Sequence, residues 1–342
     1  MVISVSPPSP RDTAPLKILV TDRIMARFGA ELGSAEDANS WQFGPSWSES
    51  EVIAALPDID VLVCSAMTPA MAQAAHQLRL VHVTGAGYDK VPLDTLRAGV
   101  TVANTFHHAA PIAEHVIMVS LMLSRRVIPT DRSLRAGAWR TVGTDGSVPF
   151  HPSFRDLTVG LVGFGGIGQE VARLARSLGM PVRAIRQNPG GALPDGLTLD
   201  WVGGTGDLPE LLATSDIVVV TVPLSDHTRG LINAEAFAAL REGALLVNVA
   251  RGPVVDLDAL VGALESGRLG GAAIDVWWGA PSDTGEAPPS VARLSTFDNV
   301  VLTPHYSGHA RSTFELRAGD IRANIASLVA GQPLINVVHT SA

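Results

Sequence analysis

The sequence predicts an α/β protein with two domains, each built around a parallel β-sheet. From Lys17 onward, short apolar segments rich in β-branched residues alternate with helical patterns, which is typical of βαβ units. A Gly- and Pro-bearing stretch at 143–152 separates a short series of these units from a longer and more regular one. The length of 342 residues also suits about two domains.

The first series predicts a small α/β domain. Its strands are expected at 18–20, 61–64, 80–83 and 100–103. Between the first two strands, Ser48 and Glu51 form a capping-box pattern that begins a short helix, which ends before Pro57. A long apolar helix is expected from Ala109 to Val127, and it joins this domain to the next.

The second series predicts a larger α/β domain. Its strands are expected at 158–162, 182–186, 217–221, 244–248, 271–275 and 300–302. A final amphipathic helix is expected over 310–330, and Gly331 closes it.

Composition excludes several classes of protein. Apolar residues make up 46% of the chain, enough for a core, so the chain is not disordered. A net charge of -8 argues against a nucleic-acid partner, which would need a basic surface. Lys17 and Lys90 are the only lysines, which disfavours Schiff-base chemistry. The single cysteine, Cys64, excludes an intrachain disulfide framework and favours the reducing cytoplasm.

The sequence gives no sign of a membrane partner. No apolar run reaches the roughly 18 residues that a membrane helix requires. Residues 1–15 are rich in Ser and Pro, and Arg11 follows the apolar stub instead of preceding it, unlike in a signal peptide. We expect 1–15 to be a mobile tail.

The second series contains the pattern G-x-G-x-x-G at Gly163, Gly165 and Gly168, between a buried strand and a helix. Gly163 permits a tight turn, Gly165 lets the backbone approach a pyrophosphate, and Gly168 allows close packing of helix and strand. The helix N-terminus adds free N–H groups and the positive end of the helix dipole. This context predicts a dinucleotide site.

The strand at 182–186 indicates which dinucleotide binds. In an NAD site this strand ends in an acidic residue that binds the ribose 2′-hydroxyl. Here the strand ends in Arg186, and no carboxylate follows before Asp195. A cation suits a 2′-phosphate, so the sequence favours NADP, with NAD as the alternative. The competing interpretation of Arg186 is a solvated surface arginine.

These residues resemble the D-2-hydroxyacid dehydrogenases, a family that includes phosphoglycerate, glyoxylate/hydroxypyruvate and formate dehydrogenases. The resemblance covers about 16–338. Besides the glycine loop it rests on Val83-Thr-Gly-Ala-Gly-Tyr-Asp89, Ile112-Ala-Glu-His115, Thr221-Val-Pro-Leu224, Asn248-Val-Ala-Arg-Gly-Pro-Val-Val-Asp256, Ala273-Ile-Asp-Val276 and Thr303-Pro-His-Tyr-Ser-Gly308. It implies two Rossmann-like domains, with a dinucleotide-binding domain (109–308) inserted into a substrate domain (16–108 and 309–342).

The resemblance also implies three residue roles. Arg251 matches the arginine that holds the substrate carboxylate and polarises its ketone, and a bidentate guanidinium suits a carboxylate. His305 matches the general acid that protonates the forming alkoxide. Asp275 matches the residue that contacts the nicotinamide amide, with a strand-end turn residue as the alternative.

Other site residues follow from the same motifs. For the substrate they are Gly85, Ala86, Gly87 and His108, where the amides of 85–87 form a second carboxylate cradle. For the cofactor they are Gly163, Gly165, Gly166, Ile167, Gly168, Arg186, Val222, Pro223, Val249, Ala250, Asp275 and Ser307. A homodimer is expected, with helix 109–127 as its face, although core packing alone also explains the Met and Leu residues of this helix.

One departure concerns the carboxylate that holds the catalytic histidine. Family members that act on hydroxy acids usually carry a glutamate before a proline in the stretch after this aspartate, and here Ala280 precedes Pro281. Glu286 and Asp283 are candidates to replace it. Formate dehydrogenases also depart there, with glutamine, but they use an asparagine near the position of His108.

Two other groups of residues carry weaker hypotheses. His107, His108, Glu114 and His115 are ligand-rich, and His305 with His309 has helical metal spacing, but zinc would need them to converge and no metal is expected. Trp277 and Trp278 either line the substrate cleft or pack onto the core.

The sequence therefore predicts an NADPH-dependent reductase of small 2-oxoacids such as glyoxylate or hydroxypyruvate. One alternative is a hydride abstraction like that of formate dehydrogenase, which needs no acid. The other is a dinucleotide-sensing binding protein, like the related C-terminal-binding corepressors.

Overall fold

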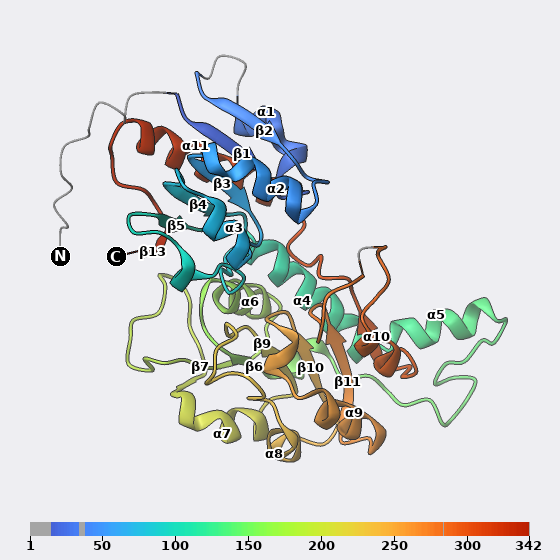
Figure 1. Cartoon of the computed structure of the whole chain (residues 1–342). Helices are drawn as coiled ribbons and strands as arrows, with labels where there is room; N and C mark the ends of the chain where they lie inside the picture. The colour runs from blue at the N-terminus through green and yellow to red at the C-terminus, as the bar shows by residue number, and fades with distance from the viewer. Residues whose placement is uncertain (1–14, 34–37, 283, 342) are drawn as a thin grey trace. The chain divides into compact units, whose positions relative to one another are not determined.

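The computed structural model describes residues 15–33, 38–282 and 284–341 (Figure 1). The tail predicted at 1–15 therefore lies, except for Pro15, outside the described residues. The chain divides into two compact units. Unit 1 comprises the residues up to His107 together with those from Ala310 onward, and unit 2 comprises His108–His309.

Unit 1 is a six-stranded sheet in the order β13-β5-β4-β3-β1-β2. The strands are β1 (Lys17–Val20), β2 (Ser40–Phe43), β3 (Val61–Cys64), β4 (Leu80–Val83), β5 (Thr101–Ala103) and β13 (Val337–Thr340). Five strands are parallel, as predicted, and β13 pairs antiparallel with β5. The sequence prediction lacked the edge strands β2 and β13, whose side chains are largely exposed and carry a weak apolar pattern.

Helices cover both faces of this sheet. They are α1 (Gly29–Leu32) and α11 (Arg311–Val329) on one face, and α2 (Glu49–Ala55) and α3 (Pro69–Ala74) on the other. The predicted capping box begins α2, because Ser48 N–H donates to Glu51 Oε2 at 2.7 Å and Ser48 Oγ accepts from Glu51 N–H. The predicted final helix is α11, and Gly331 follows it with a φ of 62°.

Unit 2 is a seven-stranded, wholly parallel sheet in the order β12-β11-β10-β9-β6-β7-β8. The strands are β6 (Val159–Val162), β7 (Val182–Ile185), β8 (Trp201–Gly203), β9 (Ile217–Val220), β10 (Ala244–Asn248), β11 (Leu269–Ile274) and β12 (Val300–Leu302). The prediction found every strand but β8, a three-residue edge strand with a single fully buried residue.

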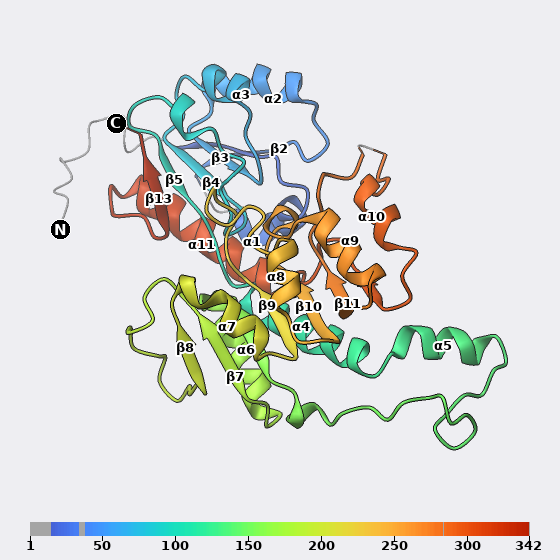
Figure 2. The same ribbon diagram turned by 90° about the horizontal axis from the view of Figure 1, so that it is seen from below.

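Helices lie on both faces of the sheet of unit 2 (Figures 1 and 2), and their apolar side chains form two layers of the core. One contains α4 (Ala109–Ser124) and α6 (Gly166–Ser177), and the other contains α7 (Leu208–Ala213), α8 (Ala234–Ala239), α9 (Leu257–Glu265) and α10 (Pro289–Leu294). Because both faces are buried, the central strands are almost entirely apolar and lack alternation.

The long helix predicted at 109–127 ends earlier than expected. Helix α4 stops at Ser124, Arg126 takes a left-handed φ of 50°, and α5 (Val127–Arg135) begins a new helix. Pro129 explains the break, since it has no N–H to donate to the carbonyl of Arg125 and its ring clashes with that carbonyl in a continuous helix. Within α5 the same proline lies in the first turn, where it is tolerated.

Within the described ranges, no helix is long and apolar enough to cross a membrane.

A buried histidine links the sheet of unit 1 to α11. His82 on β4 is fully buried, and its Nε2 lies 2.9 Å from Nδ2 of Asn324. Asn324 also binds the backbone of Ile335 through both atoms of its amide group. Burial lowers the pKa of His82 to about 4, because a charged imidazole would lose its hydration there.

His82 should make folding pH-dependent. Its pKa is lower in the folded state than in the unfolded state, so its contribution is complete above about pH 6.5 and is lost as the pH falls toward about 4. His82→Gln keeps an acceptor for Asn324 but cannot titrate. The unfolding free energy, measured with urea, should therefore fall by about 2 kcal/mol more in the wild type than in the variant between pH 7 and pH 5. Equal losses in the two proteins would contradict this role.

Candidate functional site

The parallel sheet of unit 2 brings most of the predicted site residues to one edge. In sheet order from β7 to β12, the strands' carboxyl ends lead to Arg186, Gly163, Val222, Arg251, Asp275 and His305. The chain runs outward in opposite directions from β6 and β9, so the boundary between these strands is a topological switch point. Ligands of open α/β sheets bind outside the carboxyl ends at such a point.

The three glycines of the loop after β6 have distinct environments. Gly163 has a φ of 103°, and a Cβ there would lie 2.8 Å from Val222 Cγ1. A Cβ on Gly168 would lie 2.6 Å from the carbonyl oxygen of Gly163, so only glycine lets α6 approach β6 this closely. Gly165 has no atom within 4 Å of its would-be Cβ and leaves open space at the N-terminus of α6. These environments fit the turn predicted at Gly163 and the close packing predicted at Gly168, and the approach of a pyrophosphate at Gly165 stays a prediction.

The loop is held from the neighbouring strand. Thr221 Oγ1, directly after β9, donates to the carbonyl of Gly163 at 2.9 Å. Among the described side chains none caps α6, whose first residues include Gly166 and Ile167. Its first N–H groups and its dipole are therefore available to an anion. Val222 and Pro223, at the same edge, are half-buried and exposed respectively.

Arg186 lies at the end of β7, half-buried and 5.9 Å from the ring of Phe164 in the glycine loop. Its guanidinium donates to carbonyls of the following loop, those of Pro189, Gly191 and Ala192. Its Nε is buried without an acceptor among the described residues. A surface arginine would be fully solvated. The guanidinium of Arg186 is instead held beside the glycine loop, and its Nε is still able to donate to a ligand.

The turn that carries Arg251 is organised by a buried asparagine at the end of β10. Asn248 accepts from the N–H of Ala250 at 3.1 Å and donates to the carbonyl of Arg251 at 3.1 Å. Val249 and Ala250 are buried in the two core layers, so only their backbone faces the edge. Arg251 itself is half-buried. The sequence prediction gave Asn248 no role, although it begins one of the quoted motifs.

Two tryptophans connect this turn to the loop after β12. Trp277 Nε1 donates to the carbonyl of Thr303 at 2.9 Å, and Trp278 Nε1 donates to the carbonyl of Val255 at 2.7 Å. Both rings are half-buried against the core. A Cβ on Gly252 would lie 2.4 Å from the Trp277 carbonyl group, so glycine is required where the two segments meet. Of the two alternatives for the tryptophans, the structure supports packing onto the core.

Asp275 is buried at the end of β11 and is 1% exposed. One carboxylate oxygen accepts from Thr303 Oγ1 at 2.6 Å and from Tyr306 N–H at 3.1 Å. The other accepts from the N–H of Ser307 at 3.1 Å and from its Oγ. The carboxylate thus binds the loop around His305 in the way of a strand-end turn residue. The predicted contacts of Asp275 and Ser307 with the cofactor stay predictions.

His305 is exposed and has a left-handed φ of 57°. Next to it, Tyr306 packs edge-on to His115 of α4, with ring centroids 5.6 Å apart. Burial lowers the pKa of His115, and the nearby Asp275 carboxylate opposes that shift. His108 directly precedes α4. A Cβ added to Gly308 would lie 3.2 Å from the Cβ of His108.

The segment that departs from the family pattern lies after the tryptophans. Ala280 is exposed. Glu286 is also exposed and closes a small turn, in which its N–H donates to Ser282 Oγ at 2.9 Å. Asp283, the other candidate carboxylate, lies outside the described residues.

In unit 1, the predicted cradle Gly85, Ala86 and Gly87 follows β4. Asn104 Nδ2 donates to the carbonyl of Ala86 at 2.7 Å, and Thr105 N–H donates to that of Gly85 at 3.3 Å. Thr84 Oγ1 donates to Asp22 at 2.8 Å, which ties the loop to the end of β1. A Cβ on Gly85 would meet no atom within 4 Å.

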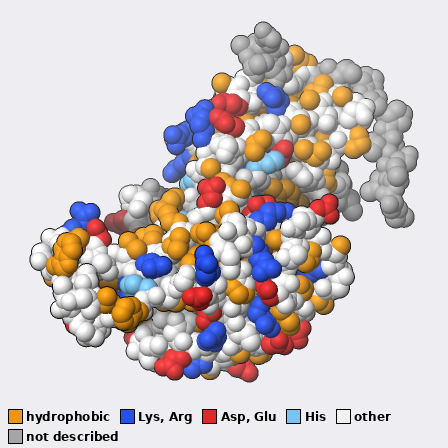
Figure 3. All heavy atoms as spheres, turned by 180° about the vertical axis from the view of Figure 1, so that it is seen from behind, with side chains coloured by type: hydrophobic (Ala, Val, Ile, Leu, Met, Phe, Trp, Pro, Cys, Tyr) orange, Lys and Arg blue, Asp and Glu red, His pale blue; other side chains and the backbone are white. Residues whose placement is uncertain are grey.

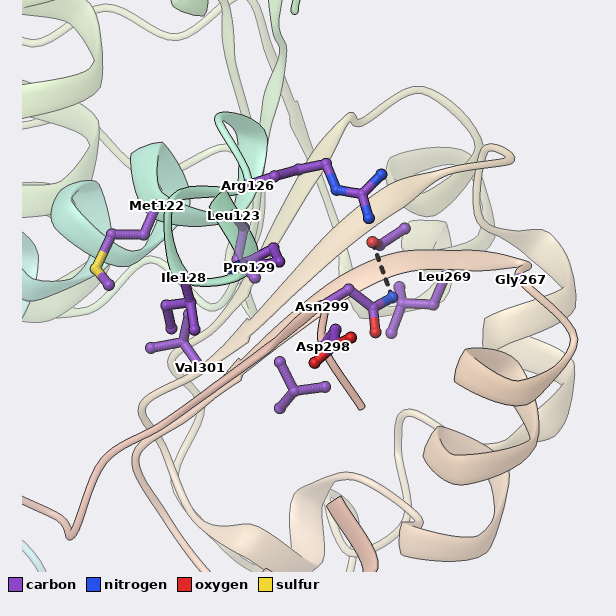
Figure 4. Close-up of a pocket in the computed structure, with 12 residues that line it drawn as sticks. Met122, Leu123, Arg126, Ile128, Pro129, Gly267, Leu269, Asp298, Asn299 and Val301 are labelled. Carbon is purple, nitrogen blue, oxygen red and sulfur yellow. Dashed lines mark hydrogen bonds between the residues drawn. The ribbon is translucent and has the colours of Figure 1, made fainter. Parts of the chain in front are cut away.

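Two other features concern metal ligands and a hollow. Among the described residues, no group of three His, Cys, Asp or Glu side chains could hold a metal ion, and His107 instead binds Asp320 at 2.8 Å. A hollow of about 340 Å³ lies at the opposite, amino-terminal edge of the sheet of unit 2, lined by Met122, Arg126, Leu269 and Val301 among others (Figure 4). Its position separates it from the glycine loop.

Comparison with known proteins agrees with this arrangement. Residues 117–307 match the family described as "D-isomer specific 2-hydroxyacid dehydrogenase, NAD binding domain". The chain is 31% identical to a glyoxylate reductase from Thermococcus onnurineus over 92% of both chains. It is 29% identical to a glycerate dehydrogenase from Methylorubrum extorquens, over 87% of this chain and 91% of that one. A solved 2-hydroxyacid dehydrogenase from Ketogulonicigenium vulgare is 25% identical, with a TM-score of 0.78, and the match covers 96% of this chain and all of that one.

The contact between Gly252 and Trp277 predicts a stability effect. Gly252→Ala places a methyl group against backbone that cannot rotate away, so the unfolding free energy should fall by about 1–3 kcal/mol. Gly262→Ala is the matched control, because this glycine lies within α9 with open space around it and should gain about 0.5–1 kcal/mol. Urea unfolding followed by circular dichroism measures both. A Gly252→Ala protein as stable as the wild type would show that the contact is looser than described.

Proposed function

The chain belongs to the D-isomer-specific 2-hydroxyacid dehydrogenases, and we propose that it reduces a small 2-oxoacid, such as glyoxylate or hydroxypyruvate, with NADPH. As a family member it is an NAD(P)-dependent dehydrogenase that acts on the CH–OH group of 2-hydroxy acids. The observation that carries the finer proposal is the arrangement of Arg186, the glycine loop, Arg251 and His305 along one sheet edge.

The residues present fit a nicotinamide dinucleotide. Gly165 leaves open space at an uncapped helix N-terminus, which suits a pyrophosphate, and the buried Nε of Arg186 lacks an acceptor. When bound, the cofactor supplies the hydride. We assign cofactor binding to the domain 109–308, which lies within unit 2. We assign substrate binding in part to the loop 85–87 of unit 1, where a Cβ on Gly85 would meet no atom within 4 Å.

Two side chains carry the remaining chemistry. Arg251 presents a planar guanidinium that suits a bidentate contact with the substrate carboxylate, and its positive charge also stabilises negative charge forming on the ketone oxygen. His305 donates the proton to this oxygen. Both residues follow buried strands, and the Asn248, Trp277 and Asp275 contacts support their turns.

A substrate panel tests the proposal directly. NADPH oxidation is measured with glyoxylate, hydroxypyruvate and larger 2-oxoacids, and NADP reduction is measured with formate. We expect turnover with at least one small 2-oxoacid and none with formate. Activity with formate alone would favour the formate-dehydrogenase-like alternative, and dinucleotide binding without turnover would favour a sensing protein.

Arg186 should set the cofactor preference. A charge-assisted contact with the 2′-phosphate is worth about 1.5–3 kcal/mol, or roughly tenfold to a hundredfold in affinity. We expect the ratio of kcat/KM for NADPH over NADH to exceed one and to invert in Arg186→Asp. Arg183→Gln is the control, since Arg183 is a neighbouring half-buried arginine that binds Glu210 and should leave the ratio unchanged. A wild-type preference for NADH would refute the NADP assignment.

Arg251 should serve the substrate and not the dinucleotide. Arg251→Ala should lower kcat/KM for the 2-oxoacid by about a hundredfold or more, while the Kd for NADPH stays within about twofold. Arg251→Lys keeps the charge but loses the planar pair of donors, and should recover only part of the loss. Fluorescence titration gives the Kd. Near-wild-type turnover in Arg251→Ala would mean that the substrate binds elsewhere.

We further propose that the protein is a homodimer. The segment from α5 to 150 extends away from the sheet of unit 2, and hydrophobic side chains gather on its surface (Figures 1 and 3). Trp139 is 71% exposed and Phe150 is 86% exposed, and Leu134 and Val142 are also exposed. Large apolar side chains in one exposed segment are typical of an interface. Met118 and Val127, within the helix predicted at 109–127, are also exposed.

Light scattering after size exclusion tests this assembly. We expect twice the chain mass of 35.8 kDa for the wild type and a lower mass for Trp139→Asp/Phe150→Asp. Leu178→Asp is the control, because Leu178 is an exposed apolar residue outside the segment. A monomeric wild type would refute the homodimer.

We place the protein in the cytoplasm. Cys64, its single cysteine, is buried at the end of β3, and burial raises the pKa of its thiol to about 12. A thiol that stays protonated and enclosed needs no oxidising compartment.

A further inference from the structure

The turn around His305 is held at two sides by neighbouring segments of unit 2. On one side, the Asp275 carboxylate binds Thr303, Tyr306 and Ser307, which flank the histidine. On the other side, Trp277 binds the carbonyl of Thr303. We propose that Asp275 is the positioning residue of His305, so that this chain orients the histidine without a carboxylate at position 280. The proposal deepens the proposed function, on which the role of His305 as the acid rests.

The backbone of His305 needs such support. Its φ of 57° lies in the left-handed region, which costs a residue with a Cβ roughly 1–2 kcal/mol. Such a conformation persists only where surrounding contacts enforce it. Here the residues on both sides of His305 in the sequence bind one buried group, and that group is the carboxylate.

The hydrogen-bond pattern commits this carboxylate to the turn. Each of its oxygens accepts from two donors, and an ionised carboxylate accepts only. Any further donor must displace one of the four. Ser307 uses both its N–H and its hydroxyl in the same way. The four donors from residues 303–307 therefore occupy the acceptor positions of the Asp275 carboxylate.

The surroundings explain why position 280 is dispensable for this task. Asp275 lies at the end of a buried strand, so its own place is fixed by the sheet. Ala280 is exposed and follows Gly279, whose φ is 122°. Beneath the turn, Tyr306 rests against the ring of His115. Among the described residues, the contacts given for the turn thus come from the sheet, from Trp277 and from α4.

Hydrogen exchange of the backbone N–H groups tests the positioning without reference to activity. Asp275→Asn keeps the shape but turns an NH₂ group toward two of the four donors of the turn, and Thr303→Val removes one donor. Both variants should speed exchange in a peptide that spans 303–309 by about tenfold or more, because local opening exposes it. Thr303→Ser keeps the hydroxyl and should exchange as the wild type does.

The matched control is Asp216→Asn. Asp216 lies at the amino-terminal edge of the same sheet, where it accepts from Thr158 N–H at 2.8 Å and pairs with Arg241 at 2.8 Å. Like Asp275→Asn, this variant weakens the hydrogen bonds of one carboxylate, but at the opposite edge of the sheet from the turn. It should leave both the exchange of 303–309 and kcat unchanged.

A double-mutant cycle separates positioning from direct contact with the cofactor. General acids contribute roughly 10²- to 10⁴-fold, so Asp275→Asn should lower kcat about tenfold to a hundredfold with little change in the Kd for NADPH. In a His305→Asn background, Asp275→Asn should cost almost nothing more, because there is no longer an acid to position. Ala280→Glu should raise kcat less than about twofold in the wild type.

The outcomes are distinct. Unchanged exchange of 303–309 in Asp275→Asn and Thr303→Val overturns the proposal, whatever the activity. Multiplicative losses in the cycle also overturn it and indicate that Asp275 contacts the cofactor directly. If the wild type reduces no 2-oxoacid, the proposed function fails, and the exchange experiment still decides whether Asp275 holds the turn.

Discussion

Parallel pairing of buried strands is the constraint on which the site of this protein depends. In unit 2, seven strands run in the same direction, so their carboxyl ends share one edge. Helices on both faces remove the central strands from water, and their continuous Val, Ile and Leu content follows from that burial. Polar residues are then placed where each strand ends. The glycine loop, Arg186, Arg251, Asp275 and His305 meet at one edge for this reason, although more than 140 positions separate the first and last of them in the sequence.

Hydrogen bonds between neighbouring loops fix the backbone at this edge. Thr221 holds the glycine loop, Asn248 closes the turn of Arg251, and Trp277 joins that turn to the segment before His305. Gly252 and Gly168 allow backbone segments to approach more closely than any side chain would permit. These contacts run to backbone carbonyl groups, so they fix main-chain positions at the edge.

A buried titratable side chain meets different partners in the two units, Asp275 in unit 2 and His82 in unit 1. The buried carboxylate of Asp275 accepts hydrogen bonds from four donors, which offset its loss of hydration. His82, with a neutral partner in Asn324, responds to burial by a lowered pKa and stays uncharged. The difference reflects the partners each side chain meets: N–H and O–H donors stabilise a carboxylate, whereas an amide offers little to an imidazolium.

The α/β class, nearly all buried strands, the glycine loop and the family were predictable from the sequence, because those features depend on local periodicity and on residue types at fixed spacing. It missed the edge strands β2, β8 and β13, whose short segments have little apolar pattern, and it ran helix 109–127 past the break that Pro129 imposes. The roles of Asn248, Trp277 and Asp275 became visible only in the tertiary structure. Each depends on partners from other strands and loops, and no spacing rule specifies which donor a buried carboxylate will meet once β11 and β12 pair side by side.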